Sequence, residues 1–156
     1  MRRQLDDYYD RFYTKEGARA RKLAANDYKL AKEIAAWKAR VAENWDTIEV
    51  KEFVLPQEDL AAGLSIGKSY TATVVVDGKE IADDLGLDLV IASSGDGAAR
   101  NTKSFEMEAV KREGTLVTFK IDFPVKYSGA YKIGFRLFPK NANLPHRMDF
   151  AYTRWF

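Results

Sequence analysis

Hydrophobic positions in the first third of the chain repeat with the period of an α-helix. In the segment NDYKLAKEIAAWKARVAENW, which begins at Asn26, apolar residues recur at spacings of four, three, four and four. These residues are Leu30, Ile34, Trp37, Val41 and Trp45. Charged residues occupy the opposite side, and Asn26 or Asp27 can supply the side-chain oxygen that caps the helix. The pattern predicts an amphipathic helix in which both tryptophans are packing residues rather than platforms for a ligand.

A shorter apolar stripe precedes this helix. It consists of Leu5, Tyr9 and Phe12, and it is widened by Tyr8 and Tyr13. We expect Gly17 to break or kink the helix ahead of the segment ARARKLAA, which can itself continue as helix. Residues 1–46 are therefore predicted to form a helical segment of two or three helices.

After Asp46 the apolar period changes from 3.6 residues to two. In YTATVVV, residues 70–76, one alternating set is Tyr70, Ala72, Val74 and Val76, and the other set is Thr71, Thr73 and Val75. Apolar residues alternate with other residues in the same way at 117–123 and 131–137. Turn sequences such as Asp77-Gly78 separate these runs. Seven strands are predicted, near residues 48–54, 68–76, 86–93, 103–111, 115–123, 129–138 and 148–155. This pattern is typical of an antiparallel immunoglobulin-like β-sandwich, here without the cysteine pair of antibody domains.

The predicted fold class is thus α+β, with the helical segment 1–46 packed on a seven-stranded sandwich formed by residues 47–156. A helix that carries Trp37 and Trp45 needs an apolar surface, so both side chains are predicted to be buried, at least partly against the sandwich. The last predicted strand, MDFAYTRWF, has aromatic residues on both of its faces. The outward set is either a sugar-binding platform or a packing surface for the helical segment, and the second interpretation is favoured.

Composition narrows the classes of function. The 25 basic and 23 acidic residues are interspersed and the net charge is only +2, so the sequence contains no basic cluster that would bind nucleic acid. Cysteine is absent, which excludes disulfides and thiolate metal sites. No apolar run approaches the roughly 20 residues that span a bilayer, and the charged start MRRQLDDYYDRF lacks the apolar region of a secretory signal. The sequence predicts a cytoplasmic protein with no membrane or nucleic-acid partner.

Side chains for catalysis are scarce. The chain has one histidine, His146, and no cysteine, so a Cys–His pair is impossible. A Ser–His–Asp triad would need His146 with Asp149, but no G-x-S-x-G elbow accompanies them. The acidic residues are scattered, and a pair of histidines at metal-binding spacing is excluded. We therefore predict no catalytic, cofactor-binding or metal-binding residue in this chain.

The stretch GFRLFPKNANLPHRMDF, residues 134–150, interrupts the run of strands. It is read either as a structured crossover between two strands or as a contact site for an anion, for glucan or for another domain. The candidate contact residues are Lys140, Asn141, Asn143, His146 and Arg147. In the structural interpretation, which is favoured, prolines end and stiffen the connection and asparagines close turns. A ring nitrogen of the histidine is then expected to bond a backbone carbonyl or a carboxylate.

The same stretch resembles the C-terminus of bacterial alpha-glucan (glycogen or starch) phosphorylases, where a strand ending in F-P-K is followed by L-P-H-R and a last strand. The residues that carry the resemblance are Phe138, Pro139, Lys140, Leu144, Pro145, His146, Arg147, Asp149 and Phe150. LDDYYDRFY, residues 5–13, is similar to the helix that leaves the second nucleotide-fold domain of these enzymes. AAWKARVAENW, residues 35–45, is similar to the helix before their C-terminal sandwich. The three segments occur in the expected order along the chain.

This resemblance implies a parent enzyme that releases glucose 1-phosphate from α-1,4-glucan by phosphorolysis, with pyridoxal phosphate as cofactor. It also implies that the cofactor lysine and the substrate sites lie in upstream catalytic domains of the same polypeptide, because no segment here matches them. The chain is then a non-catalytic accessory region that supports architecture or assembly, without a cofactor of its own. The alternatives are a carbohydrate-binding module for glucan and a stand-alone protein-interaction sandwich.

Overall fold

The computed structural model describes residues 13–56, 64–93, 102–126 and 131–156. The first apolar stripe and most of the segment LDDYYDRFY fall outside these residues. The chain divides into two compact units, Met1–Ala42 and Glu43–Phe156, which are described separately.

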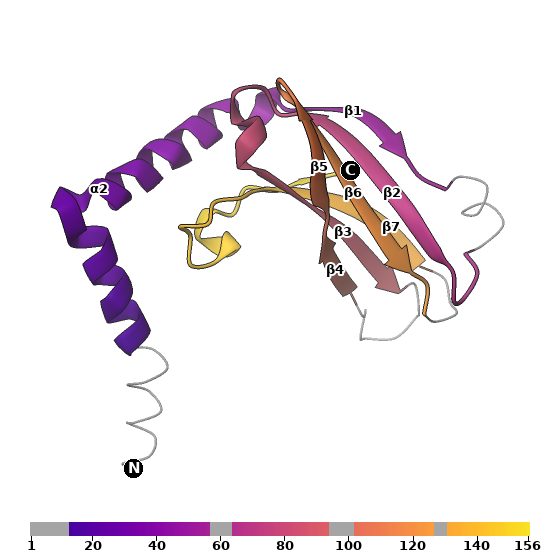
Figure 1. Cartoon of the computed structure of the whole chain (residues 1–156), viewed down its shortest axis with the longest axis horizontal. Coiled ribbons are helices and arrows are strands. Elements are labelled where there is room, and N and C mark those ends of the chain that lie inside the picture. The colour runs from indigo at the N-terminus through magenta and orange to yellow at the C-terminus, as the bar shows by residue number, and fades with distance from the viewer. Residues whose placement is uncertain (1–12, 57–63, 94–101, 127–130) are drawn as a thin grey trace, which may run out of the picture. The chain divides into compact units, whose positions relative to one another are not determined.

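The first unit consists of most of helix α2 (Thr14–Asn44), which is interrupted once. Asn26, Asp27 and Tyr28 have positive φ angles of 53°, 54° and 60°, and the helix changes direction there (Figure 1). Asparagine and aspartate tolerate this left-handed conformation better than most residues, which explains why the interruption falls at Asn-Asp. The predicted break at Gly17 is wrong, because this glycine lies within regular helix. Among the described residues, the predicted helical segment contains one interrupted helix, and the prediction of two or three helices also covers residues that the structure does not describe.

The apolar stripe of α2 is oriented as predicted. Trp37 is 6% exposed and Val41 is fully buried, while Leu30 and Ile34 are half-buried. Trp45, which opens the 3₁₀-helix η2 (Trp45–Thr47), is 5% exposed. The low exposure expected of both tryptophans is confirmed, and packing of Trp37 against the sandwich stays a prediction. No helix among the described residues is both long and apolar enough to cross a membrane.

Two antiparallel sheets of four strands make up the second unit (Figure 1). In sheet A the strand order is β1 (Glu49–Val54), β2 (Ser69–Asp77), β6 (Leu116–Pro124) and β5 (Glu108–Glu113). In sheet B the order is β4 (Thr102–Glu106), β3 (Leu85–Ser93), β7 (Tyr131–Pro139) and β8 (Arg154–Trp155). The 3₁₀-helix η3 (Lys79–Asp84) connects β2 to β3, and η4 (Arg147–Phe150) lies between β7 and β8.

Alternate side chains of the central strands form the core between the sheets. The buried residues are Ala72, Val74 and Val76 of β2, Val117 and Phe119 of β6, Leu85, Leu87 and Leu89 of β3, and Phe135 and Leu137 of β7. Phe53 of sheet A and Phe135 of sheet B have ring centroids 5.6 Å apart, so side chains of the two sheets meet across the interior. The period of two in the sequence corresponds to this alternation of buried and outward positions.

The predicted strand 103–111 is in fact two strands that belong to different sheets. β4 pairs with β3 and β5 pairs with β6, and Met107 is the single residue between them. Met107 is 4% exposed, and its N–H donates to the carbonyl of Leu87 at 2.7 Å. The chain changes sheets at a buried residue without breaking its extended conformation, so no turn sequence marks the crossing. The described residues therefore form eight strands instead of seven.

The predicted strand 148–155 is also largely wrong. Residues 147–150 form the 3₁₀-helix η4, and only Arg154 and Trp155 pair with β7. The rings of Phe150 and Tyr152 pack at a tilt of 44° with centroids 4.8 Å apart, and Tyr152 contacts Trp45 edge-on at 5.6 Å. Local ring packing and capping thus replace the expected alternation of faces in this segment.

Candidate functional site

The crossover between β7 and β8 is an ordered series of turns. The N–H of Lys140 donates to the carbonyl of Asp84 at 2.7 Å, which fixes the start of the crossover against the end of η3. Oδ1 of Asn141 accepts the N–H of Asn143 at 2.9 Å, and the carbonyl of Asn141 accepts the N–H of Leu144 at 3.1 Å. The prediction that an asparagine closes a turn through its side-chain oxygen is confirmed for Asn141.

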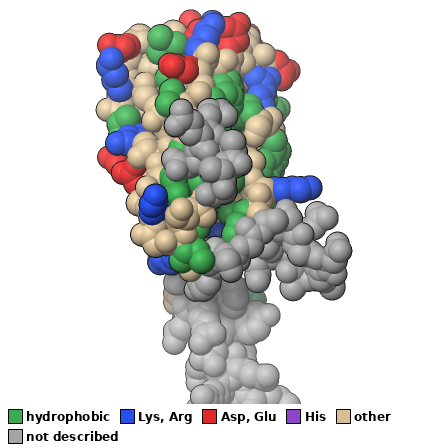
Figure 2. Space-filling view, turned by 90° about the vertical axis from the view of Figure 1, so that its right-hand side faces the viewer, with side chains coloured by type: hydrophobic (Ala, Val, Ile, Leu, Met, Phe, Trp, Pro, Cys, Tyr) green, Lys and Arg blue, Asp and Glu red, His purple; other side chains and the backbone are tan. Residues whose placement is uncertain are grey.

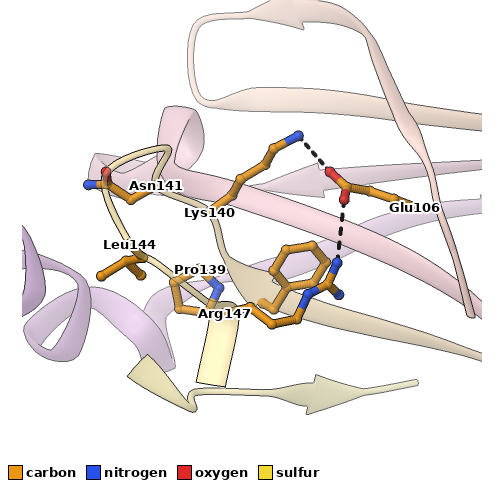
Figure 3. A pocket seen from close by; sticks show the side chains of 7 residues that line it. Glu106, Pro139, Lys140, Asn141, Leu144 and Arg147 are labelled. Atoms are coloured by element: carbon orange, nitrogen blue, oxygen red, sulfur yellow. Dashed lines mark hydrogen bonds and ion pairs between the residues drawn. The ribbon is translucent and has the colours of Figure 1, made fainter. Parts of the chain in front are cut away.

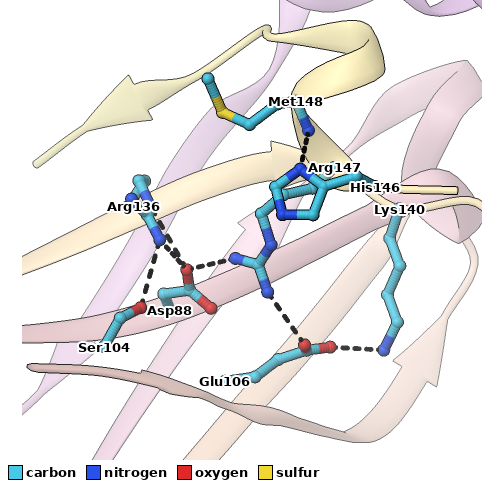
Figure 4. Close-up of polar contacts among 8 residues, drawn as sticks. All are labelled: Asp88, Ser104, Glu106, Arg136, Lys140, His146, Arg147 and Met148. Carbon is cyan, nitrogen blue, oxygen red and sulfur yellow. Dashed lines mark hydrogen bonds and ion pairs between the residues drawn. The ribbon is translucent and has the colours of Figure 1, made fainter. Parts of the chain in front are cut away.

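A buried carboxylate anchors the crossover to the sheet. Asp88, in the middle of β3, is 1% exposed, and its Oδ2 accepts hydrogen bonds from two arginines (Figure 4). Arg136 of β7 donates from Nη2 at 2.6 Å and from Nε at 3.2 Å, and Arg147 of the crossover donates from Nη1 at 2.6 Å. A buried charge is costly unless it is paired and hydrogen-bonded, and the two guanidinium groups pair it through Oδ2, whereas the buried Oδ1 accepts no hydrogen bond from the described residues.

Arg147 also reaches a second carboxylate, at the end of β4. Its Nη2 lies 3.4 Å from Oε2 of Glu106, whose Oε1 accepts from Nζ of Lys140 at 2.5 Å. The guanidinium of Arg147 lies 4.2 Å from the centroid of the Phe138 ring, within the range of a cation–π contact. Arg147 therefore connects the crossover to β3, β4 and β7 at once.

These residues surround a small hollow of about 140 Å³. It is lined by Glu106, Phe138, Pro139, Lys140, Asn141, Leu144 and Arg147 (Figure 3). Both cations that line it already contact Glu106, so an anionic ligand would have to compete with a carboxylate that is covalently part of the protein. The arrangement is suited to holding the crossover in place, and it provides no nucleophile beside a base.

His146 is used differently from the prediction. It is exposed, and its Nδ1 accepts the N–H of Met148 at 3.1 Å, which caps the first turn of η4. The expected bond to a carbonyl or a carboxylate is wrong, because the ring stands just before a helical turn whose free N–H needs an acceptor. The candidate residues thus separate: Lys140, Asn141 and Arg147 line the hollow, whereas Asn143 and His146 support turns beside it.

Sequence reasoning missed the partners of the crossover cations. Asp88, Glu106 and Arg136 all lie in strands, and none was a candidate residue. A signal was present in the sequence, because Asp88 is a charged residue within the otherwise apolar run LGLDLV. A charge at such a position needs an oppositely charged partner from another strand.

A second ion-pair cluster lies at the other sheet. Asp77, at the end of β2, is 7% exposed, and Nζ of Lys79 lies 2.6 Å from its Oδ2. Hydrogen bonds from Lys79 and from Thr115 lower the pKa of Asp77 from 3.8 to about 2. Lys51 contributes a further cation at 3.8 Å. This cluster tightens the β2–η3 turn, where the backbone of Lys79 has a positive φ of 49°.

The described residues do not fit a site for pyridoxal phosphate or for a metal. A Schiff-base lysine must be enclosed with its cofactor, but every lysine whose side chain is described is exposed or half-buried. No group of three or more potential metal ligands occurs in the described ranges. Cationic and anionic side chains are also interspersed on the face drawn in Figure 2, which shows no patch of a single charge.

Comparison with known proteins identifies a family that matches most of this chain. Residues 45–156 match the family described as Glycogen phosphorylase C-terminal domain. A segment of 52 residues is 36% identical to maltodextrin phosphorylase of Thermococcus litoralis. That segment is 33% of this chain and only 6% of the archaeal protein, so the match spans a small part of a much longer polypeptide.

Proposed function

Because this chain belongs to the glycogen phosphorylase C-terminal domain family, we propose that it is a non-catalytic accessory domain that supports the architecture or assembly of an alpha-glucan phosphorylase. One observation carries the structural role. Lys140 and Arg147, the crossover residues best suited to hold an anionic substrate, are paired with carboxylates of the domain itself. These cations stabilise the domain and are not left unpaired for a ligand to bind.

The proposal assigns the chemistry to the rest of the polypeptide. The parent enzyme would cleave α-1,4-glucan with phosphate to give glucose 1-phosphate, as the name of the archaeal relative suggests. Pyridoxal phosphate would bind in upstream catalytic domains, and those domains would be the main partner of this chain. We expect the enzyme to act in the cytoplasm.

We further infer that the two sheets form an immunoglobulin-like sandwich. In that fold strands A, B, E and D form one sheet in the order ABED, and C, F and G belong to the other. Sheet A has the order β1-β2-β6-β5, and sheet B has the order β4-β3-β7-β8, which corresponds to the second sheet with one added edge strand. Residues 47–156 would be this domain, and residues 1–46 would continue from the catalytic domains.

Two measurements test the accessory role. The purified chain, incubated with maltoheptaose and phosphate, is expected to release no glucose 1-phosphate and to show no absorbance of bound pyridoxal phosphate. The longer enzyme with residues 45–156 deleted is expected to melt at a lower temperature or to lose its native assembly. Release of glucose 1-phosphate by this chain alone would overturn the proposal.

A second candidate function, binding of glucan, is favoured by a different observation. Trp155 is 56% exposed, whereas Trp37 and Trp45 are buried. An exposed indole is a surface on which a sugar ring can stack. No observation favours the stand-alone interaction protein.

A further inference from the structure

We propose that Trp155 is the stacking platform of a binding site for α-1,4-glucan on the outer face of sheet B. The inference rests on the proposed function, because glucan is the polymer that the parent phosphorylase would degrade. The proposed site is distinct from the crossover, whose residues were not assigned a ligand. The argument depends on how the indole is held, on its polar neighbours and on its exposure.

The backbone on both sides of Trp155 is fixed to β7. Trp155 pairs with Arg136, and Phe135 and Phe156 exchange two backbone hydrogen bonds of 3.1 Å. Leu87 and Leu89 of β3 and Leu137 of β7 point into the core, so Arg136 and its partner Trp155 face outward. This two-residue strand therefore presents the indole on the outer face at a defined register.

The ring lies against the strand instead of projecting from it. A Cβ atom placed on Gly134 would be 3.7 Å from Cε3 of Trp155 and 3.8 Å from its Cζ3. These are ordinary contact distances, so the indole rests over the backbone of β7 at Gly134. Trp155 is 56% exposed in this position, so a large part of the residue is available to solvent.

Polar side chains surround the platform. The guanidinium of Arg136 lies 5.6 Å from the centroid of the Trp155 ring, and bonds to Asp88 at 2.6 Å and to Ser104 at 3.2 Å hold it there. The register places Ser104, Val90 and Gly134 in one row across the outer face, and Thr102, Ala92 and Lys132 in a neighbouring row. Ser104, Thr102 and Lys132 are exposed, so hydroxyl and ammonium groups share this face with the ring.

A sugar polymer fits this combination better than a protein partner does. A pyranose ring offers an apolar C–H face for stacking and a rim of hydroxyl groups for hydrogen bonds, which a lone aromatic ring among polar groups can satisfy. Lysine and serine are depleted in protein interfaces, and the outward neighbours Lys132 and Ser104 are exposed beside this ring. One ring also suits one sugar of a curved, soluble chain, whereas a flat crystalline polysaccharide would need a row of rings.

The tryptophan content of the chain gives a direct test. Of its three tryptophans, Trp155 alone is exposed, so acrylamide quenching of the intrinsic fluorescence reports mainly on this residue. Maltoheptaose is expected to protect the fluorescence from acrylamide and to shift the emission to shorter wavelength. Cellohexaose, which has β-1,4 linkages, is expected to have a much smaller effect.

Variants identify the platform. Trp155→Ala is expected to weaken retardation of the chain in starch-containing native gels and to raise the Kd for maltoheptaose about tenfold, which corresponds to the loss of one stacking contact. Trp155→Phe should retain part of the affinity. Tyr13→Ala, at an aromatic residue that is 67% exposed in the first unit, should bind glucan as the parent chain does. Thermal melts of each variant establish that the fold is intact.

Three results would overturn the glucan site: no protection of Trp155 by maltoheptaose, unchanged affinity in a folded Trp155→Ala variant, or a Trp155 already shielded from acrylamide in the longer enzyme without glucan. The last result would instead identify the face as a contact with another domain. The proposed accessory role fails independently, through release of glucose 1-phosphate by the isolated chain. A folded chain that neither binds glucan nor releases glucose 1-phosphate thus removes the glucan site and leaves the accessory role standing.

Discussion

Asp88 and Arg147 are 59 residues apart in the chain, yet Oδ2 of the carboxylate and Nη1 of the guanidinium meet at 2.6 Å. This pair joins the crossover to the centre of sheet B. Because Asp88 is 1% exposed and Arg136 shares the same oxygen, the pairing is much less screened by water than an ordinary surface ion pair.

Removing the carboxylate should therefore be costly. We expect Asp88→Ala to lower the free energy of unfolding by about 3–5 kcal/mol, because two arginines lose the partner that compensates their partial burial. Urea denaturation followed by circular dichroism measures the change. Asp46→Ala is the matched control: its carboxylate lies 3.6 Å from Arg154 but is 96% exposed, so its loss should cost less than about 1 kcal/mol. Equal effects of the two substitutions would contradict the anchoring role.

Two glycines of sheet B should respond differently to a methyl group. A Cβ at Gly86 would lie 2.5 Å from Cζ of Phe138, a ring that is 5% exposed and is covered by Arg147. Gly86→Ala should cost about 1–3 kcal/mol, the usual range for overpacking. Gly134→Ala makes only ordinary contacts of 3.7 Å or more and should change stability by less than about 0.5 kcal/mol. Comparison of their melting curves checks this, and a tolerated alanine at position 86 would show that the Phe138 ring can move.

The burial of Trp37 leads to a prediction for the helical unit. Trp37→Ala should lower the free energy of unfolding by about 3–5 kcal/mol, because a large buried side chain leaves a cavity. Trp155→Ala should cost much less, since that side chain is 56% exposed. Thermal or urea unfolding of the two variants gives the comparison. A shift below a degree or two for Trp37→Ala would mean that its site collapses without loss or is exposed in solution.

The lowered pKa of Asp77 leads to a prediction of how the free energy of unfolding depends on pH. Its pKa is lowered from 3.8 to about 2, chiefly by the hydrogen bond from Lys79 and then by that from Thr115. A carboxyl group with a lower pKa in the folded state stabilises the protein above its unfolded pKa, and this contribution is lost as the pH falls from about 4 towards 2. Asp77→Asn should flatten the pH dependence of the urea midpoint over that interval. The urea midpoint of both proteins, measured between pH 2 and pH 6, tests this prediction. If the midpoint of Asp77→Asn changes with pH as steeply as that of the parent chain, a role for Asp77 is excluded.

Regular alternation made most of the strands predictable. β2, β6 and β7 lie within one or two residues of the ranges expected from the sequence, because each buries one face. The crossing at Met107 could not be predicted in the same way, because a chain that passes between sheets in an extended conformation keeps its period of two. The interruption of α2 fell at Asn26 and Asp27 rather than at Gly17, since local left-handed turns can use asparagine and aspartate.

The site was predicted less completely than the fold. The turn closed by Asn141 follows from local chemistry and was expected, whereas Arg147 was expected to be structural without its partner being identified. The partners Asp88 and Glu106 come from strands far away in the sequence, and which strands are neighbours is a property of the sheet order. The role of His146 depended on η4, a single helical turn too short to give a periodic signal.

The position of Met107, the single residue between β4 and β5, bears on where the two sheets can separate. Met107 covalently joins β4, at the edge of sheet B, to β5, at the edge of sheet A. The opposite edges, β1 and β8, are held together by side chains such as the Phe53–Phe156 pair, whose ring centroids are 5.8 Å apart. The connection through η3 also joins the two sheets, between β2 and β3, whereas no direct connection joins β1 to β8, so partial opening is expected to begin at the β1–β8 margin. The amide of Phe156, which donates to the carbonyl of Phe135, should exchange with solvent deuterium well before the amides of β3 and β6, because the margin that carries the exposed indole is expected to open first.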